Sequence, residues 1–385
     1  MKLIRGVRRL ITVGHFYGVA EYRKLADEMA RLGGSSWELL VVAPSFVNTA
    51  ADMCPIAFEQ RAGGGHAATE AVKLHLNRRI HFMFYGAKLR RLLRERDWDI
   101  VYAVEEPFNL CGWQVALTAP KRAKFVFLTF QNIAKTYPFP YGAFERYSVC
   151  RSAGWLASGE TVARTMLERG YGVKPHKIVP LGVDTDRFRP DRAVGAGIRE
   201  RLGWAGKADP VVGYVGRFVE EKGINLLMRA LSHCTTPWRA LFVGSGPLER
   251  QLRLWAKDRG DQVRIVTGVH HSQVPDYLNA MDVLCVPSQS TRRWREQFGR
   301  AIVEAFACGV PVIGSDSGEV PYVMRGAGMV LGEKDEPAWA NGIATLLSSP
   351  AKRCELARNG RDTALSYYSW PTVAARHLEF FEQLS

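Results

Sequence analysis

Long apolar runs are missing from this sequence: none approaches the ~20 residues that a transmembrane helix needs. The N-terminal segment MKLIRGVRRLITVGHF is basic but lacks the apolar core and small-residue cleavage site of a signal peptide, so it predicts a first strand. The seven cysteines form no C-x-x-C pair and show no histidine spacing typical of zinc. We therefore expect a cytoplasmic chain with reduced, mostly buried thiols.

Two further signatures are absent. Gly14 and Gly18, after the first predicted strand, do not form G-x-G-x-x-G, which disfavours a NAD-dependent Rossmann enzyme. No nucleic-acid recognition module is recognisable, so nucleic acid is not an expected partner.

Asp184-Thr-Asp186 matches a D-x-D pattern that can hold a metal on a diphosphate, but it lies in a Gly/Pro-flanked linker. We interpret it as a turn with helix-capping aspartates and expect neither a metal nor another cofactor.

Positive charge is abundant and uneven. Residues 1–190 contain 28 Lys+Arg and 17 Asp+Glu, whereas residues 191–385 contain 24 and 21. A basic half indicates an anionic partner such as a membrane surface, although a basic protein without such a partner has the same composition. Within residues 77–96, Leu89, Leu92 and Leu93 form a helical stripe beside arginines. We interpret the stripe as packing on the chain's own sheet, and peripheral contact with the inner face of a membrane stays open.

The chain of 385 residues is long enough for two domains. Short apolar runs alternate with helical patterns, and glycines follow many of the runs, which predicts an α/β protein with parallel sheets and a ligand crevice at the strands' C-terminal ends. Residues 47–75 are less regular and contain Gly63-Gly64-Gly65-His66, so we predict a loop there, either a mobile binding loop or a surface excursion. Strands are expected at 9–14, 37–43, 99–103, 124–129, 154–158, 210–216, 240–244, 263–267, 282–286 and 310–314, and a last helix with an apolar face is expected to end at Leu384.

The stretch from Glu296 to Val323 carries the strongest functional pattern. Glu296 is expected in a loop and Glu304 in the helix that begins near Arg300. The start of a helix offers free N–H groups and a positive dipole to an anion, while a carboxylate beside it suits hydroxyl groups. A diphosphate that carries sugar hydroxyls is a nucleotide-sugar, which is the ligand this pattern favours.

Four motifs follow one another in the second half: Val212-Gly-Tyr-Val-Gly-Arg217 with Glu221-Lys222-Gly, then Phe242-Val-Gly-Ser-Gly-Pro247, then Glu296-x7-Glu304, then Gly314-Ser-Asp-Ser-Gly-Glu319. With them the chain resembles glycosyltransferase family 4, the glycogen synthase or group 1 type. The resemblance implies the GT-B fold, with two Rossmann-like domains facing across a cleft and a C-terminal helix crossing back to the first. It implies an acceptor domain at 1–185 plus 369–385 and a nucleotide-sugar domain at 186–368.

The resemblance also implies roles for single residues. Arg217 and Lys222 would bind the donor diphosphate, and two cations at a strand exit suit a departing diphosphate. Glu296 would bind hydroxyls of the transferred hexose, and Glu304 would bind the ribose. The remaining donor-binding positions implied are Gly14, Gly244, Val269, Phe298, Gly299 and Arg300.

One position departs from the family pattern. Many members have a histidine after the strand that here ends at Thr129-Phe130, whereas this chain has Gln131, which cannot titrate. His15 or the pair Glu105 and Glu106 are therefore further candidates on the acceptor side.

The resemblance implies a retaining hexosyl transfer from a UDP- or GDP-sugar to a hydroxyl of a glycan or a lipid-linked acceptor. A nucleotide-sugar epimerase or hydrolase of the same fold is the alternative enzyme, and a catalytically silent nucleotide-sugar-binding protein is the alternative without catalysis.

Overall fold

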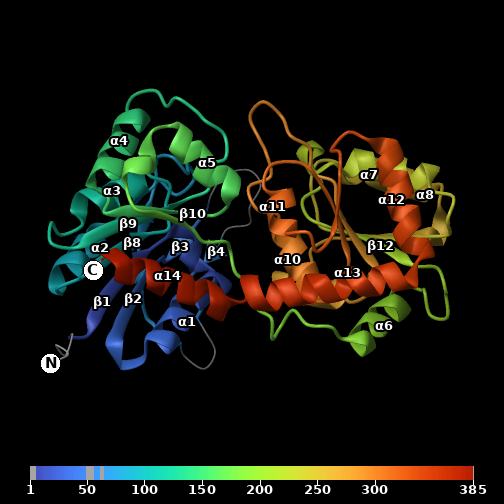
Figure 1. Ribbon diagram of the computed structural model, residues 1–385, viewed down its shortest axis with the longest axis horizontal. Coiled ribbons are helices and arrows are strands. Elements are labelled where there is room, and N and C mark those ends of the chain that lie inside the picture. The colour runs from blue at the N-terminus through green and yellow to red at the C-terminus, as the bar shows by residue number, and fades with distance from the viewer. Residues whose placement is uncertain (1–5, 49–55, 61–64, 385) are drawn as a thin grey trace. The chain divides into compact units, whose positions relative to one another are not determined.

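The computed structural model describes residues 6–48, 56–60 and 65–384. The chain forms two compact units (Figure 1). Unit 1 comprises Met1–Pro180 and Trp370–Ser385, and unit 2 comprises Leu181–Ser369.

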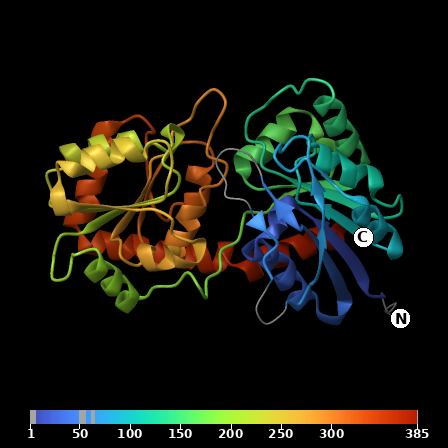
Figure 2. The ribbon, with the colours of Figure 1, turned by 180° about the vertical axis from the view of Figure 1, so that it is seen from behind.

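A seven-stranded parallel sheet in the order β11-β10-β9-β8-β1-β2-β5 forms the centre of unit 1. Helices cover both of its faces (Figure 2), so the inner strands β8 and β10 are buried along their whole length. The strands of the sheet are β1 (Arg8–Val13), β2 (Trp37–Pro44), β5 (Ala68–Val72), β8 (Ile100–Ala103), β9 (Lys124–Thr129), β10 (Gly154–Ala157) and β11 (His176–Ile178), and the helices are α1 (Lys24–Gly33), α2 (Ala87–Glu95), α3 (Leu110–Thr118), α4 (Tyr141–Arg151), α5 (Glu160–Glu168) and α14 (Trp370–Leu384).

The last helix, α14, belongs to unit 1, as the family resemblance implied. Val373, Leu378 and Phe381 are buried in the core that α14 shares with α1 and the sheet. Phe381 packs edge-on against Tyr102 of β8, with ring centroids 5.2 Å apart. Unit 1 is therefore built from two separate parts of the sequence.

The predicted loop at 47–75 is wrong in part. Residues Ala68–Val72 form β5, an edge strand that pairs in parallel with β2 from Leu40↔Ala68 to Pro44↔Val72. The segment Ala-Thr-Glu-Ala-Val escapes prediction because only its last residue is buried, so it lacks an apolar pattern. Gly63 and Gly64 of the predicted glycine loop lie outside the described residues, whereas Gly65 and His66 are exposed.

The leucine stripe of α2 packs as predicted. Leu89, Leu92 and Leu93 are buried in the core of unit 1, so this helix cannot present them to a bilayer. Among the described residues no helix has the length and apolar composition to cross a bilayer.

The predicted turn at Asp184 is confirmed, since the Asp184 carboxylate accepts hydrogen bonds from the backbone N–H groups of Asp186 and Arg187 at 3.2 Å each. The capping role is corrected: the aspartate that caps the next helix is Asp191.

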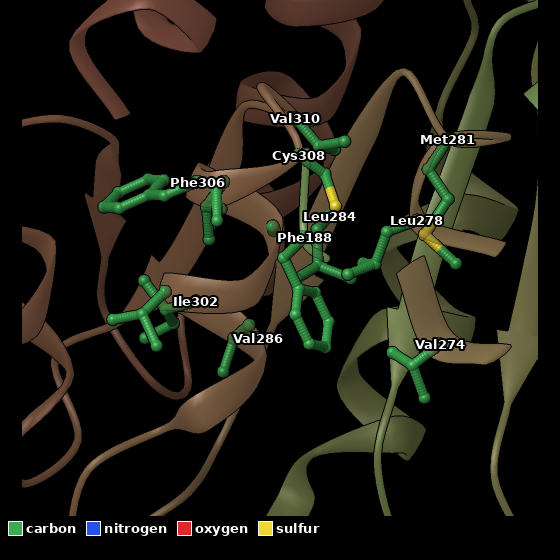
Figure 3. Close-up of a cluster of buried hydrophobic side chains, with 14 of the residues drawn as sticks. Phe188, Val274, Leu278, Met281, Leu284, Val286, Ile302, Phe306, Cys308 and Val310 are labelled. Carbon is green, nitrogen blue, oxygen red and sulfur yellow. The ribbon is translucent and has the colours of Figure 1, made fainter. Parts of the chain in front are cut away.

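Unit 2 repeats the architecture with a six-stranded parallel sheet in the order β14-β13-β12-β15-β16-β17. Alternate residues of β15 enter two different cores, because helices cover both faces. Figure 3 shows one of these cores, where Leu284 of β15 lies with Leu278 of α9 and Ile302 of α10. The strands are β12 (Val211–Val215), β13 (Arg239–Val243), β14 (Val263–Val266), β15 (Val283–Val286), β16 (Val312–Ser315) and β17 (Met329–Leu331), and the helices are α6 (Arg192–Arg201), α7 (Ile224–His233), α8 (Glu249–Lys257), α9 (Val274–Leu278), α10 (Arg300–Ala307), α11 (Val320–Met324), α12 (Glu336–Ser348) and α13 (Pro350–Thr363).

Both sheets reverse their strand order at an inner position. In unit 1 the order reverses between β1 and β8, and in unit 2 it reverses between β12 and β15. In open parallel sheets the loops part at such a point, and ligands bind beyond the carboxyl ends of the two strands. The topology therefore marks two places: the residues after Val13 and Ala103 in unit 1, and those after Val215 and Val286 in unit 2.

Candidate active site

A pocket of about 300 Å³ lies at the reversal point of unit 2. It is bounded by the ends of β12 and β15, the start of α10 and the loop that holds His271. Six predicted donor residues line it together: Arg217, Lys222, Glu296, Gly299, Arg300 and Glu304. The structure thus brings together residues that are up to 87 positions apart, from Arg217 to Glu304.

Gly223 lets the two loops of this pocket touch. Its φ of +69° is left-handed, and a Cβ placed on it would lie 1.6 Å from the carbonyl oxygen of Pro287. No other residue type fits without moving the backbone. The contact fixes the Lys222 turn against the end of β15, and so fixes one wall of the pocket.

Lys222 and Glu296 form the polar floor of the pocket. The Lys222 ammonium donates to Glu296 Oε2 at 2.6 Å, and the Ser288 hydroxyl donates to the same oxygen at 2.7 Å. The Lys222 ammonium also lies 5.1 Å from the centre of the Trp294 ring, within the range of a cation–π contact. Glu296 is 5% exposed, and these partners offset the free-energy cost of burying its polar side chain.

Glu304 lies in the first turns of α10, as predicted, and forms a second polar group. Its Oε1 is 2.9 Å from His271 Nε2 and 3.3 Å from an Arg300 nitrogen. Gly299, with φ +83°, is the N-cap that turns the chain into this helix. The first N–H groups of the helix have no partner within it, so this wall can bind an anion.

His271 was not predicted as a site residue. It lies in a short 3-10 turn before α9, two residues after the implied position Val269. Its position next to Glu304 depends on tertiary packing, and no local pattern in the sequence signals it. The carboxylate predicted to bind ribose is already held by an imidazole and a guanidinium.

Arg217 follows β12 and lines the pocket with a side chain that is 47% exposed. Its guanidinium is 3.9 Å from the Glu221 carboxylate, which is a long ion-pair distance. The Tyr214 hydroxyl donates to the Arg217 carbonyl at 2.7 Å and fixes the backbone at this strand exit. The backbone is thus fixed at this strand exit, while the side chain lines the pocket.

Three of the donor positions implied in unit 2 do not line this pocket: Gly244, Val269 and Phe298. The Phe298 side chain is a core residue that meets Tyr368 edge-on at 6.0 Å. Gly244 serves close backbone packing instead, since a Cβ on it would lie 1.9 Å from the Gly216 carbonyl oxygen. Gly14, His15, Glu105, Glu106 and Gln131 belong to unit 1.

His15 and Glu105 meet at the reversal point of unit 1. Glu105 Oε2 lies 2.6 Å from His15 Nδ1, and Glu105 Oε1 accepts from the His15 backbone N–H at 2.7 Å and from the Tyr85 hydroxyl at 2.6 Å. Burial would raise the pKa of Glu105, but the His15 ring and the hydrogen bonds from His15, Tyr85 and Cys111 together lower it. Nε2 of His15 is buried and has no partner among the described residues. An ionised carboxylate thus fixes one ring nitrogen and leaves the other for a ligand.

Glu106 follows Glu105 in the sequence, and its pKa is shifted in the opposite direction. Its carboxylate accepts from the Thr129 hydroxyl at 2.8 Å and from the Phe130 backbone at 2.7 Å. Burial raises the pKa of Glu106 to about 7, although these two hydrogen bonds oppose the rise. Gln131 is also buried beside the same strand end.

Opposite pKa shifts predict opposite effects of pH on two neighbouring variants. Between pH 4.5 and about 7 the folded state binds a proton at Glu106 that the unfolded state releases, so this group's contribution to stability falls as pH rises. Glu106→Gln should therefore be more stable than the wild type at pH 8, by about 1 to 3 kcal/mol, with the gain vanishing toward pH 4.5. Urea unfolding at several pH values measures this.

Glu105→Gln is the matched control for that measurement. Because the pKa of Glu105 is lower in the folded state than in the unfolded state, this group stabilises the fold above its unfolded pKa, and the stabilisation is lost as the pH falls. The decrease in unfolding free energy caused by Glu105→Gln should therefore be largest at pH 8. If Glu106→Gln changed the unfolding free energy equally at pH 5 and pH 8, the raised pKa assigned to Glu106 would be wrong.

Comparison with known proteins places the chain in a family. The family model of glycosyl transferases group 1 matches residues 199–363. A GDP-mannose-dependent alpha-(1-6)-phosphatidylinositol monomannoside mannosyltransferase of Mycobacterium tuberculosis is 32% identical over 312 residues, which are 76% of this chain and 78% of that protein. The chain belongs to the group 1 glycosyl transferases, which confirms the predicted family.

Other relatives match over shorter ranges. The Mycolicibacterium smegmatis mannosyltransferase of the same description is 36% identical over 52% of this chain, and a D-inositol 3-phosphate glycosyltransferase of Xylanimonas cellulosilytica is 31% identical over 64%. In these two matches the chain spans only 54% and 61% of the relatives' length.

Solved structures confirm the predicted GT-B fold. Anabaena HepE in complex with UDP has a TM-score of 0.72 at 18% identity, covering 98% of this chain and 100% of that one. WaaG, described as a glycosyltransferase involved in lipopolysaccharide biosynthesis, has a TM-score of 0.63 at 17% identity, covering 96% and 99%. At such identities the likeness shows the fold alone.

Proposed function

We propose that this chain transfers a hexosyl group from a nucleoside diphosphate sugar to a hydroxyl of a glycan or lipid-linked acceptor, with retention at the anomeric carbon. The observation that carries the proposal is the unit 2 pocket, where Lys222, Arg217 and the start of α10 surround the space beside Glu296 and Glu304. Cations and helix N–H groups suit a diphosphate, while the two carboxylates suit hydroxyls of the ribose and the sugar. The membership in the family supports the same reaction class.

GDP-mannose is the donor to test first, and UDP-sugars come second. The relatives from Mycobacterium tuberculosis and Mycolicibacterium smegmatis are GDP-mannose-dependent enzymes with a phosphatidylinositol monomannoside acceptor. Other relatives are D-inositol 3-phosphate glycosyltransferases. A phosphoinositol group, free or lipid-linked, is therefore the acceptor class that these names support.

The pocket suits a same-face displacement. The acceptor oxygen bonds to the anomeric carbon, the bond from that carbon to the phosphate oxygen breaks, and the acceptor's proton goes to the leaving phosphate. Glu296 is a poor nucleophile for a double displacement, because Lys222 and Ser288 already donate to one of its oxygens. Lys222, Arg217 and the start of α10 would stabilise the charge on the leaving diphosphate.

On the acceptor side we propose His15 as the group that binds the reacting hydroxyl. Its partnerless Nε2 can accept a hydrogen bond, and Glu105 fixes the ring through Nδ1. Gln131, where many family members have a histidine, cannot take over a proton. The proposal leaves Glu106 as a neighbour whose protonation changes near neutral pH.

Donor binding is tested by a thermal-shift series with GDP, UDP, ADP and CMP and their sugars. Binding at about 100 times Kd adds about 2.7 kcal/mol to the stability of unit 2, which corresponds to a rise in Tm of roughly 5 to 10 °C. Glu304→Gln should weaken nucleotide binding about 10- to 100-fold, because an amide replaces the carboxyl group that accepts the ribose hydrogen bonds.

Glu249→Gln on α8 is the matched control, because it makes the same change at a carboxylate outside the pocket. A series with no shift for any nucleotide would refute the proposed function. Donor consumption without an acceptor would favour the epimerase or hydrolase, and donor binding without turnover on any phosphoinositol, glycan or lipid-linked acceptor would favour a silent binding protein.

A further inference from the structure

A second cavity of about 570 Å³ lies in unit 2, at the edge of the sheet opposite to the candidate active site. It is lined by Asp282, the residue before β15, and by the turn at 308–310 before β16, whereas the active-site pocket lies at the carboxyl ends of the strands. Helices α6 and α13 supply further walls (Figure 1). Among the described residues the two pockets have no lining residue in common, so the proposed reaction makes no use of this cavity.

Arginine is the most frequent residue in the lining of this cavity, which we call the arginine pocket. The four arginines are Arg192 and Arg199 of α6 and Arg358 and Arg361 of α13. Arg199 donates to Asp282 Oδ2 at 2.8 Å, and Arg361 donates to a backbone carbonyl of the segment before α6 at 3.0 Å, so the fold already holds these two guanidinium groups. In the part of the chain that the structure describes, the side chains of Arg192 and Arg358 have no ion pair or hydrogen bond, and both are exposed.

The two acidic residues in the described lining are already engaged. Asp191 is the N-cap of α6, and its Oδ1 accepts from a backbone N–H of the first turn at 3.0 Å. Asp282 Oδ2 accepts from a backbone N–H of β12 at 2.7 Å as well as from Arg199. Four guanidinium groups and two carboxylates leave a net charge of +2 in the described lining, and neither carboxylate is bonded to Arg192 or Arg358.

The arginine pocket is preformed, because backbone packing fixes its walls. Gly195 of α6 lies so close to the end of α9 that a Cβ on it would be 2.1 Å from the Asn279 carbonyl oxygen. The Asn279 side chain accepts from the Asp191 N–H at 2.8 Å and donates to the Arg189 carbonyl at 3.0 Å. The start of α6 is therefore held in place, and a ligand that binds there finds its site already formed.

We infer that the arginine pocket binds a phosphorylated small molecule of the size of a sugar phosphate. A guanidinium donates two parallel hydrogen bonds to phosphate oxygens and keeps its charge throughout the physiological pH range, and two such groups balance the charge of a phosphomonoester dianion. The first turn of α6 adds the positive end of its helix dipole. The volume of the pocket is in the range of small-molecule sites, and Ala196 and Met281 offer apolar surface to the body of the ligand.

Calorimetric titration of the full chain with mannose 6-phosphate tests the inference, with mannose and inorganic phosphate as reference ligands. The wild type should bind mannose 6-phosphate on the order of 100-fold more tightly than mannose, because the neutral sugar lacks the group that the two guanidinium groups bind. Arg192→Gln with Arg358→Gln should weaken the binding of mannose 6-phosphate roughly 10- to 100-fold. Ala357→Glu should also weaken it, since this change places a carboxylate in the lining while all four arginines remain.

Arg201→Gln with Lys352→Gln is the matched control, because it removes the same charge from α6 and α13 outside the pocket. An equal loss with this pair would mean that net charge alone attracts the ligand, and would overturn the inference. A wild type that does not bind mannose 6-phosphate would overturn it as well. Equal affinity for inorganic phosphate would show that the pocket does not recognise the body of a larger ligand, and would overturn the assignment of a sugar phosphate.

Lys222→Met with Glu296→Gln separates the two pockets. This variant changes the candidate active site, so it should bind mannose 6-phosphate as the wild type does. A loss of binding would place the ligand in the active site and overturn the inference. Arg192→Gln with Arg358→Gln should keep the thermal shifts with GDP and UDP. Because a wild type without any nucleotide shift refutes the proposed function alone, the two failures are distinct.

Discussion

Replacing Lys222 with alanine is expected to lower the rate of glycosyl transfer about 100- to 1000-fold. Lys222 is a cation in the pocket beside the proposed diphosphate position, and losing one such donor to a developing charge has an effect of this size. The measurement is kcat with the donor that the thermal-shift series identifies. Transfer at a near-wild-type rate by a folded variant would remove Lys222 from the mechanism.

The ion pair with Glu296 calls for a second variant. Lys222→Ala also leaves a carboxylate that is 5% exposed without its cation, which should cost roughly 1 to 3 kcal/mol of stability because Lys222 itself is partly exposed. Lys222→Met with Glu296→Gln removes both charges and should regain that stability. If the double variant regains activity as well, the role of Lys222 is to hold Glu296, and the charge argument for the leaving group is wrong.

Gly223→Ala is expected to destabilise unit 2 by roughly 2 to 5 kcal/mol and to abolish donor binding. The added methyl group would lie 1.6 Å from the Pro287 carbonyl oxygen at a left-handed φ, so both strain and overlap oppose it. Because the Lys222 turn must then move away from the end of β15, the pocket loses one wall. Thermal unfolding with and without nucleotide measures both effects.

Gly197→Ala is the same substitution at another site, and we expect it to raise the stability of unit 2. Gly197 lies within α6, and a Cβ on it meets nothing within 4 Å. The change should stabilise unit 2 by about 0.5 to 1 kcal/mol, because alanine has the higher helix propensity. Two alanine variants with equal effects would contradict the packing argument for Gly223.

The strands and candidate site residues of unit 2 were easier to predict than those of unit 1, because the candidate site of unit 2 lies in local sequence motifs. Strand exits such as Val215-Gly216-Arg217 combine an apolar run, a glycine and a cation within a few residues. The sequence therefore indicates both the strand and a candidate ligand-binding residue at its end. The same holds for Glu296 and Glu304 around the start of α10. His271 could not be found this way, because its contact with Glu304 arises only when α9 and α10 pack together.

In unit 1 the informative contacts join distant residues. His15 and Glu105 are separated by 90 positions, and only the adjacency of β1 and β8 brings them together. Both were candidates, but the sequence did not reveal that they form a pair. The edge strand β5 was missed because only its last residue is buried. The Phe298 side chain belongs to the core, so the predicted role of this position rests on its backbone N–H group alone.

The return of α14 to unit 1 has a consequence for how the chain is made. Residues 370–384 complete a unit whose other residues end at Pro180, so all of Leu181–Ser369 must be synthesised before that core can close. At about 5 to 20 residues per second the delay is roughly 10 to 40 s. During this time the surface of β1, β8 and α1 that later covers Phe381 remains open to solvent or chaperones. The unit that leaves the ribosome first is thus the one that finishes folding last.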